Sequence, residues 1–259
     1  ISGLSVGSGD GYDAAINVAA ATATYTVTDD DATTISIVSA TLSEDGGNMN
    51  IGIVSDSGLK FDKDVTVTVA LTPGSATAAD YGTLSSTTIT LPLTSTTGFV
   101  TLPIIDDLIV DGDEAFTAKI TNLSVGTGDG YDASISTTNL AQYTIFDNDE
   151  AIITVSANKA ANEGNVTADN SVIEFTVTLD NMVDEELTLD YSTIAGTALA
   201  SSDFIAVTAG SITFDALTAN NSQTVSIQLV EDKTVEANES FSVEIGGLEV
   251  PDNTYEVSL

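Results

Sequence analysis

Apolar and polar residues alternate in short runs along most of this chain of 259 residues. Residues 65–71 read Val-Thr-Val-Thr-Val-Ala-Leu, and residues 88–91, 99–104 and 116–120 follow a similar pattern. Alternation places the apolar side chains on one face, as in a half-buried β-strand. Glycine, asparagine and aspartate separate many of the runs, and no segment keeps a helical period. The pattern predicts an all-β protein.

A long segment of the sequence occurs twice. Residues 4–14 (Leu-Ser-Val-Gly-Ser-Gly-Asp-Gly-Tyr-Asp-Ala) return almost unchanged as residues 123–133. Each copy leads to a strand that contains a tyrosine and then to an acidic triplet, at 29–31 and 147–149. The period is about 120 residues, the size of one domain. Seven or so short strands in that length predict tandem immunoglobulin-like antiparallel β-sandwiches.

The period divides the chain into three predicted pieces. Residues 1–31 are the closing hairpin of a preceding repeat, residues 32–149 a complete sandwich, and residues 150–259 a second sandwich that lacks its last strand. Residues 16–31 of one copy could therefore complete the open sheet of a neighbouring copy by strand addition. Such head-to-tail exchange builds open filaments. A window cut from a longer array accounts for the same ends.

The composition excludes several classes of function. The chain has 39 acidic residues against 5 basic ones, a formal net charge of −34, and neither cysteine nor histidine. Nucleic acids and anionic membrane surfaces need basic contacts, so neither is an expected partner. A histidine-based catalytic triad, a disulfide and a usual zinc site are impossible. No apolar run is long enough to insert into a membrane.

Acidic residues of the complete repeat gather where its strands should end, and loops cluster at the ends of a sandwich. Carboxylates about 5 Å apart repel by roughly 3 kcal/mol per pair at an effective dielectric near 20, so a compensating cation is needed. Calcium is the hard cation that suits many carboxylates. The candidate metal residues are Glu44, Asp80, Asp106, Asp107, Asp111, Glu114, Asp147, Asn148 and Asp149.

The second repeat offers acids at matched positions but has no closing triplet. These candidates are Glu163, Asp203, Glu231, Asp232, Glu236 and Glu239. The triplet of a neighbouring copy, Asp29, Asp30 and Asp31, would complete that cluster across a junction. Paired carboxylates can hydrolyse glycosides, but these acids form metal-like clusters, so we expect no enzyme.

The ordered motifs resemble the Calx-β domain. They are an early acid after the first strand, Ala-Ala-Asp-Tyr at 78–81 (Ser-Ser-Asp-Phe at 201–204), Ile-Ile-Asp-Asp at 104–107 before Asp-Gly-Asp-Glu-Ala-Phe at 111–116, and Phe-Asp-Asn-Asp at 146–149. That family includes the calcium-sensing domains of sodium–calcium exchangers and recurs in tandem in large bacterial surface proteins. The resemblance implies that the matched acids are calcium ligands; Asn148 within the triplet and Leu108 after the aspartate pair depart from it.

Two functions follow as hypotheses. The first is a calcium-binding structural repeat of an extracellular bacterial adhesin or surface filament, made rigid by Ca²⁺ at the domain ends and joined head-to-tail to neighbouring copies. The second is a regulatory calcium-sensor pair within a larger membrane or signalling protein. The Gly-Asp-Gly-Tyr-Asp loops at 9–13 and 128–132 are expected to be hairpin turns, since Asp-Gly tolerates positive φ; a small extra cation site is the alternative.

Overall fold

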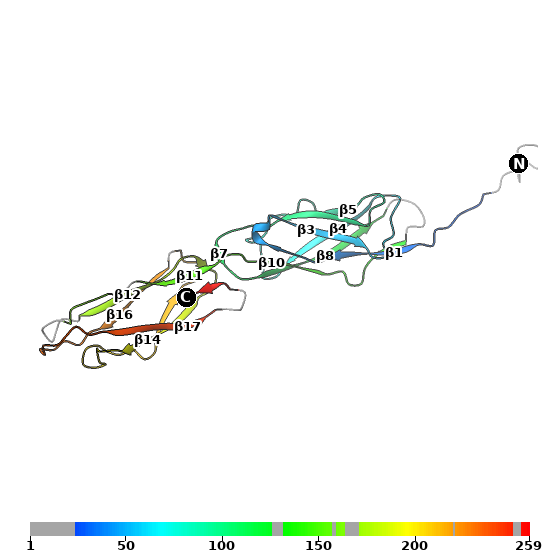
Figure 1. Ribbon diagram of the computed structural model, residues 1–259. Coiled ribbons are helices and arrows are strands. Elements are labelled where there is room, and N and C mark those ends of the chain that lie inside the picture. The colour runs from blue at the N-terminus through cyan, green and yellow to red at the C-terminus, as the bar shows by residue number, and fades with distance from the viewer. Residues whose placement is uncertain (1–23, 126–131, 157–158, 164–170, 220, 251–254) are drawn as a thin grey trace, which may run out of the picture.

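Two β-sandwiches lie end to end in the computed structural model (Figure 1). The structure describes residues 24–125, 132–156, 159–163, 171–219, 221–250 and 255–259. Within these ranges every regular element is a strand, apart from one short 3₁₀ turn, η2 (Glu44–Gly46). No helix in the described ranges has the length and apolar character needed to cross a membrane. The predicted all-β fold class is confirmed.

The first sandwich is built from two facing sheets. One sheet has the order β6-β3-β1-β9 and consists of β1 (Ala32–Val38), β3 (Asn48–Ser55), β6 (Thr97–Pro103) and β9 (Asp132–Ile135). The other has the order β2-β10-β8-β4-β5 and consists of β2 (Ala40–Ser43), β4 (Val65–Pro73), β5 (Thr88–Leu91), β8 (Glu114–Ser124) and β10 (Ala141–Phe146).

The alternation seen in the sequence places the core between these sheets. In β4, Val65, Val67 and Val69 are at most 2% exposed, while the threonines between them are half-buried on the outer face. Phe116 packs between two tyrosine rings, with its centroid 4.8 Å from that of Tyr81 and 5.2 Å from that of Tyr143. Tyr81, which follows the loop acid Asp80, is therefore part of the core.

The second sandwich repeats this plan. One sheet has the order β16-β12-β11-β18, with β11 (Ala151–Val155), β12 (Val172–Leu179), β16 (Ser222–Gln228) and β18 (Val257–Ser258). The other has the order β15-β14-β17, with β14 (Leu187–Ala195), β15 (Gly210–Phe214) and β17 (Phe241–Glu249). Phe204, the counterpart of Tyr81, is 1% exposed and stacks on Phe241 with ring centroids 4.2 Å apart.

The strand pairing adds one feature to the predicted antiparallel sandwich. Most neighbouring strands are antiparallel, but β9 pairs with β1, β10 with β2, and β18 with β11 in parallel. The first strand of the domain breaks at Ser39, so that β1 joins one sheet and β2 the other. In the first sandwich, β9 therefore lies beside β1 in one sheet, and β10 lies beside β2 in the other.

The predicted domain boundaries stay predictions. Most of the proposed closing hairpin, residues 1–31, lies outside the described residues, and residues 24–31 form no strand. The first Gly-Asp-Gly-Tyr-Asp loop also lies outside them, as does the second except for Asp132 at the start of β9. In the described part of the second sandwich, β17 pairs only with β14, whereas its counterpart β8 lies between β4 and β10.

A short strand of the first domain belongs to the second domain by its contacts. This strand, β7 (Ile109–Val110), pairs in parallel with β13 (Met182–Val183). The carbonyl of Val110 accepts a hydrogen bond from the backbone N–H of Asp184 at 3.2 Å. The Val110 side chain is fully buried and packs in the hydrophobic core of the second sandwich. The loop between β6 and β8 therefore joins the two domains.

Candidate metal centre

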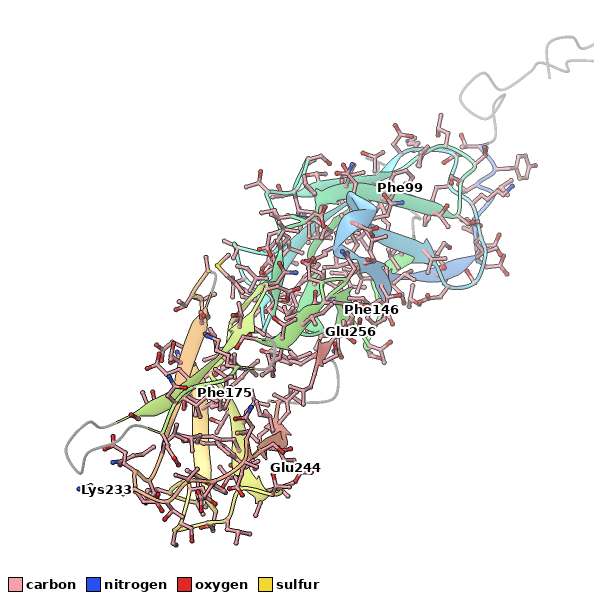
Figure 2. All side chains as sticks on the ribbon, turned by 60° about the vertical axis from the view of Figure 1, so that its left-hand side comes forward. Phe99, Phe146, Phe175, Lys233, Glu244 and Glu256 are labelled. Carbon is pink, nitrogen blue, oxygen red and sulfur yellow. The ribbon has the colours of Figure 1, made fainter. Side chains whose placement is uncertain are left out.

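Carboxylates from four separate loops meet at the pole of the first sandwich that faces the second. Glu44 opens η2, Asp80 lies between β4 and β5, Asp111 follows β7, Glu114 begins β8 and Asp147 follows β10. They form two groups of three that share Asp111, and within each group the carboxylate oxygens lie within 4.8 Å of one another: Glu44, Asp111 and Asp147, and Asp80, Asp111 and Glu114. Phe146, the residue before Asp147, is labelled at this junction in Figure 2.

Local hydrogen bonds fix the loops that carry these acids. The Oδ2 atom of Asp147 accepts the backbone N–H groups of Asp111 at 3.1 Å and Gly112 at 3.0 Å. Its Oδ1 atom accepts the N–H of Asp149 at 2.8 Å. Gly112 has a φ of 72°, a left-handed conformation that a residue without Cβ adopts at little cost. Asp147 therefore positions both Asp111 and the end of its own triplet.

The Asp80 loop is held against the same pole. Asp80 Oδ2 accepts the backbone N–H of Thr77 at 2.6 Å, and its carbonyl accepts the N–H of Ile105 at 2.9 Å. Gly74 lets this loop approach closely, since a Cβ at that position would collide with the carbonyl oxygen of Ala115. These contacts bring Asp80 next to Glu114, at the start of β8.

Two carboxylates of the cluster are buried with an oxygen that has no partner. Glu44 is 6% exposed and Asp149 is 8% exposed. Neither Glu44 Oε1 nor Asp149 Oδ2 has a hydrogen-bond partner in the structure. In protein mutants, burying a polar group without a hydrogen-bond partner costs roughly 1–3 kcal/mol. Burying an unpaired charge costs more. Such oxygens in a native fold call for an explanation, and a bound cation is one that also accounts for the crowding of carboxylates here.

The pKa values of the cluster also favour a bound cation. Burial, together with the nearby Asp149 and Asp147, raises the pKa of Glu44 to about 8. Burial and the charge of Asp147 raise the pKa of Asp111 to about 7, and burial with Asp80 raises that of Glu114 to about 8. The protein without a cation therefore holds protons that carboxylates normally lose near pH 4.

The donor set fits calcium. Every side chain in the two groups is a carboxylate, and no nitrogen or sulfur ligand is among them. Hard oxygen donors of this kind favour Ca²⁺, which takes six to eight oxygens. A divalent ion would satisfy the unpaired oxygens of Glu44 and Asp149 and would remove the repulsion among their neighbours.

The other predicted residues of this pole have different surroundings. Asp107 Oδ1 accepts the N–H of Ile109 at 2.8 Å and so forms the turn that leads into β7. Asp106 and Asp107 lie outside the two groups but are close enough to raise the pKa of Asp149, after the larger effect of its burial. Asn148 Oδ1 accepts the N–H of Asp45 and the hydroxyl of Ser43, both at 3.1 Å. Asn148 thus fixes the turn that presents Glu44.

The second domain contributes an acid that the sequence analysis missed. Asp184 follows β13 directly, and its charge adds to the raised pKa of Asp111 and of Glu114. Burial raises the pKa of Asp184 itself, although the Tyr255 hydroxyl donates a hydrogen bond to its carboxylate and opposes this shift. The only sequence signal was that Asp184 follows the apolar pair Met182-Val183. Its position depends on the non-local pairing of β7 with β13.

The matched acids of the second domain form a similar but open cluster at its far pole. The groups are Glu163, Asp232 and Glu236, and Asp203, Glu236 and Glu239, all partly or fully exposed. The Asp203 loop repeats that of Asp80, with its Oδ2 accepting the N–H of Leu199 at 2.6 Å and its carbonyl that of Val230 at 2.9 Å. Partial desolvation, with Asp232 or Asp203 nearby, raises the pKa of Glu236 and Glu239.

Two further sets of predicted residues lie apart from these groups. Glu231 accepts the hydroxyl of Ser171 at 3.2 Å, and its other oxygen is buried without a partner. The triplet Asp29, Asp30 and Asp31 is exposed just before β1, at the opposite pole of the first sandwich (Figure 1). Its contribution to a neighbouring copy stays a prediction, as do the ligand roles of all the candidate acids.

Comparison with known proteins identifies the class of domain. A model of the Calx-beta domain matches residues 28–149 and again residues 147–258. The chain therefore belongs to the Calx-beta family and contains two such domains in tandem. Calx-beta domains are non-catalytic and typically bind calcium. None of the curated proteins compared matches the chain.

Several solved structures resemble the chain at low identity. CBD12 from CALX1.2 is 19% identical over 86% of this chain and 84% of its own, with a TM-score of 0.39. The calcium binding domain CBD12 of CALX1.1 is 20% identical over 85% and 82%, with a TM-score of 0.37. The apo form of the Calx CBD1 domain is 19% identical over 46% of this chain and 100% of its own, with a TM-score of 0.38. The family assignment rests on the two matches to the domain model.

Proposed function

We propose that this chain is a calcium-binding structural repeat of an extracellular surface filament or adhesin. Calcium at the first acidic pole would hold the two domains in a fixed relative orientation. The observation that carries this proposal is the buried, unpartnered carboxylate oxygen of Glu44, with that of Asp149 beside it, at the pole against which the second domain packs.

The residues divide the work as follows. Glu44, Asp111, Asp147 and Asp149 would hold one ion, and Asp80 with Glu114 would extend the site through Asp111. When bound, calcium supplies the positive charge that allows these carboxylates to ionise together. Asp147 accepts the N–H groups of Asp111 and Gly112, and so fixes the chain directly after β7. Ordering that loop orders the junction, because Val110 packs in the core of the second sandwich.

The extracellular location is supported by charge and by the ion itself. A net charge of −34 with only 5 basic residues disfavours close packing of the domains in the absence of cations. Extracellular Ca²⁺ modules work at dissociation constants of about 10⁻⁴–10⁻³ M, far above cytosolic calcium. The chain would thus be flexible before export and stiff afterwards.

Calcium titration by calorimetry, followed by small-angle X-ray scattering with and without chelator, tests this proposal. We expect at least one site on the first domain and a narrower distribution of interdomain angles in calcium. Glu44→Gln is the informative variant, because it keeps the shape of the side chain and removes its charge. Absence of calcium binding at millimolar concentrations, or scattering curves that coincide with and without chelator, would contradict the proposal.

A regulatory sensor pair is the second candidate, and the junction itself supports it. The segment that follows Asp107 enters the core of the second domain through Val110, so a change at the ion site would reach that domain directly. A sensor must respond over a narrow range of calcium with a large change in angle. A filament repeat needs only to stay rigid above a threshold, so the scattering titration separates the two.

A further inference from the structure

The second domain carries, at its far pole, a copy of the loop by which the first domain holds the second. Residues 107–111 (Asp-Leu-Ile-Val-Asp) correspond to residues 232–236 (Asp-Lys-Thr-Val-Glu), which we call the docking loop. Both begin with the same turn: Asp107 accepts the N–H of Ile109 at 2.8 Å, and Asp232 accepts that of Thr234 at 2.7 Å.

The matched valines of these loops have opposite environments. Val110 is fully buried in the core of the second sandwich, whereas Val235 is 99% exposed. A single exposed valine is ordinary on a protein surface, but the burial of the matched Val110 shows that this position of the loop can enter the core of another sandwich. Figure 2 shows the neighbouring Lys233 at the free end of the second domain.

The first domain carries the matching receptor at its own free pole. In the second domain, the carbonyl of Val183 accepts the N–H of Leu217 at 2.7 Å, and Leu217 has a φ of 53°. In the first domain, the carbonyl of Phe61 accepts the N–H of Thr94 at 3.1 Å, and Thr94 has a φ of 63°. Phe61 therefore occupies the position of Val183, and residues 59–64 form what we call the acceptor segment.

The acceptor segment has apolar surface where the matched segment of the second domain is covered. Val183 is 1% exposed beneath β7, while Phe61 is only half-buried. Leu93, which donates its backbone N–H to Asp64 at 3.1 Å, is 52% exposed in the adjoining turn. Val183 at the internal junction shows how such a surface is covered: a β-strand lies along it, and one valine enters the core.

The charges of these two poles differ from those of the internal junction. The acceptor segment contains Lys60 and Lys63, two of the five basic residues of the chain, together with Asp62 and Asp64. The docking loop and its continuation to residue 239 carry Asp232, Glu236 and Glu239. At the internal junction, the position of Lys63 is taken by Glu185, which raises the pKa of Asp184 by its charge. With Lys63 in place of Glu185, the outer contact has one like charge fewer than the internal junction.

We propose that the docking loop of one copy binds the acceptor segment of a second copy of this chain. Residues 234–235 would pair in parallel with residues 60–61, as β7 pairs with β13, and Val235 would cover Phe61 and Leu93. The two surfaces lie at opposite ends of the elongated molecule (Figure 1), so each copy has one of each to offer. A heterologous contact of this kind builds an open filament. This docking stands on its own geometry and differs from strand donation by residues 16–31.

Sedimentation velocity of the whole chain in millimolar calcium, from about 10 µM to 1 mM, tests the docking. We expect concentration-dependent chains, and a Val235→Asp variant whose association is weaker by at least about tenfold, which is 1.4 kcal/mol. Phe61→Asp, and Leu93→Asp in case the first variant unfolds, should have the same effect. Leu140→Asp, which is at a site 65% exposed outside both surfaces, is the matched control and should associate like the parent.

Mixing the variants gives the sharpest result. Val235→Asp retains only the acceptor segment and Leu93→Asp only the docking loop, so an equimolar mixture should form one-to-one complexes and nothing larger. A chain that stays monomeric at 1 mM would overturn the proposal, as would a Val235→Asp variant that assembles like the parent. Loss of assembly in Val27→Asp, at a site 95% exposed, with normal assembly in Val235→Asp would favour strand donation instead.

Calcium titration of the Val235→Asp variant separates this proposal from the calcium function. The acids of the first domain lie at the internal junction, so binding there should match that of the parent, while the new carboxylate beside Glu236 changes only the group of the second domain. Assembly that persists in excess chelator, with the same response to the variants, would support docking and argue against a need for calcium. Loss of calcium binding together with assembly would show that Val235→Asp disrupts the fold and not the contact, and would overturn the assignment of Val235.

Discussion

Glu44 in the first domain is 6% exposed and has an oxygen without a partner, whereas its counterpart Glu163 in the second domain is half-exposed. Both residues belong to three-carboxylate groups built from the same motif. The surroundings of the two residues differ, because Asp147 and Asp149 of the closing triplet lie beside Glu44, whereas Glu163 lies with Asp232 and Glu236. The same motif is thus desolvated in one position and hydrated in the other.

The two acidic groups therefore differ in their residues as well as in their burial. Desolvation raises the pKa values of Glu44, Asp111 and Glu114 to about 7–8. The neighbour also adds Asp184 to the charge around the first pole. We therefore expect a cation to stabilise the first group of acids more than the second, and the following measurements test that difference.

Withdrawal of calcium should have the largest effect. Ligand that binds only the folded state at 1,000 times its dissociation constant stabilises by about 4 kcal/mol. For a domain of this size we expect the first unfolding transition to fall by roughly 10 °C or more in excess chelator. The transition of the second domain should fall by less. Differential scanning calorimetry measures both, with magnesium as a control ion; equal shifts of the two transitions would remove the contrast.

Removing one carboxylate from each site should have the next largest effect. We expect Glu44→Gln to weaken calcium binding by about tenfold or more, or at least 1.4 kcal/mol, because it deletes a buried negative charge. The same change at Glu163 should have a smaller effect, since water already screens that site. In chelator, Glu44→Gln should melt at a higher temperature than the parent. Calorimetric titration and melting curves of both variants provide the check.

Truncation of the matched valines should separate the two loops. Val110→Ala should destabilise the second domain by about 1–2 kcal/mol, even though the residue belongs to the first domain's sequence, because a fully buried side chain is lost. Val235→Ala should change the stability of the isolated chain by no more than about 0.5 kcal/mol. Urea denaturation measures the change in the free energy of unfolding. Native-state hydrogen exchange then shows in which domain the change occurs. Equal effects of both substitutions would show that Val110 is not a structural contact.

Stability without calcium should depend on pH in an unusual direction. Folding raises the pKa values of Glu44 and Glu114 from 4.5 to about 8, so the folded state binds more protons than the unfolded state between these values. In chelator, the contribution of these two groups to the free energy of unfolding should therefore be greatest below about pH 4.5. It should be lost as the pH rises toward 8. We expect the first domain to melt a few degrees higher at pH 5 than at pH 8. Saturating calcium should reverse the trend, since the ion competes with protons.

Much of the fold was accessible from local pattern. The alternation in β4 predicted Val65, Val67 and Val69 on a buried face, and the structure confirms it. The aromatic residues that follow the loop acids in the two motifs, Tyr81 and Phe204, both lie in the core. The ordered acidic motifs led to the Calx-beta family, which the domain model matches twice. These features depend on residues close in sequence, whose order alone carries the signal.

The candidate site could be predicted only in part. Strand ends that meet at one pole brought Glu44, Asp80, Asp111, Glu114 and Asp147 together, because a sandwich gathers its loops at its two ends. Asp107 and Asn148 were also expected among the ligands; each accepts a backbone N–H, as Asp147 does, and their ligand roles stay predictions. Sequence spacing does not show which acids come within 4.8 Å of one another, because that depends on how the loops fold.

The strand pattern, the repeated domain and the acids at the strand ends can be read from the amino-acid sequence. That Val110 packs in the second domain, that Asp184 approaches the acids of the first, and that Glu44 and Asp149 are buried became visible only in the folded chain. Alternation and motif order are local properties of the chain. Burial of a charge depends on which segments, often distant in sequence, come to surround it.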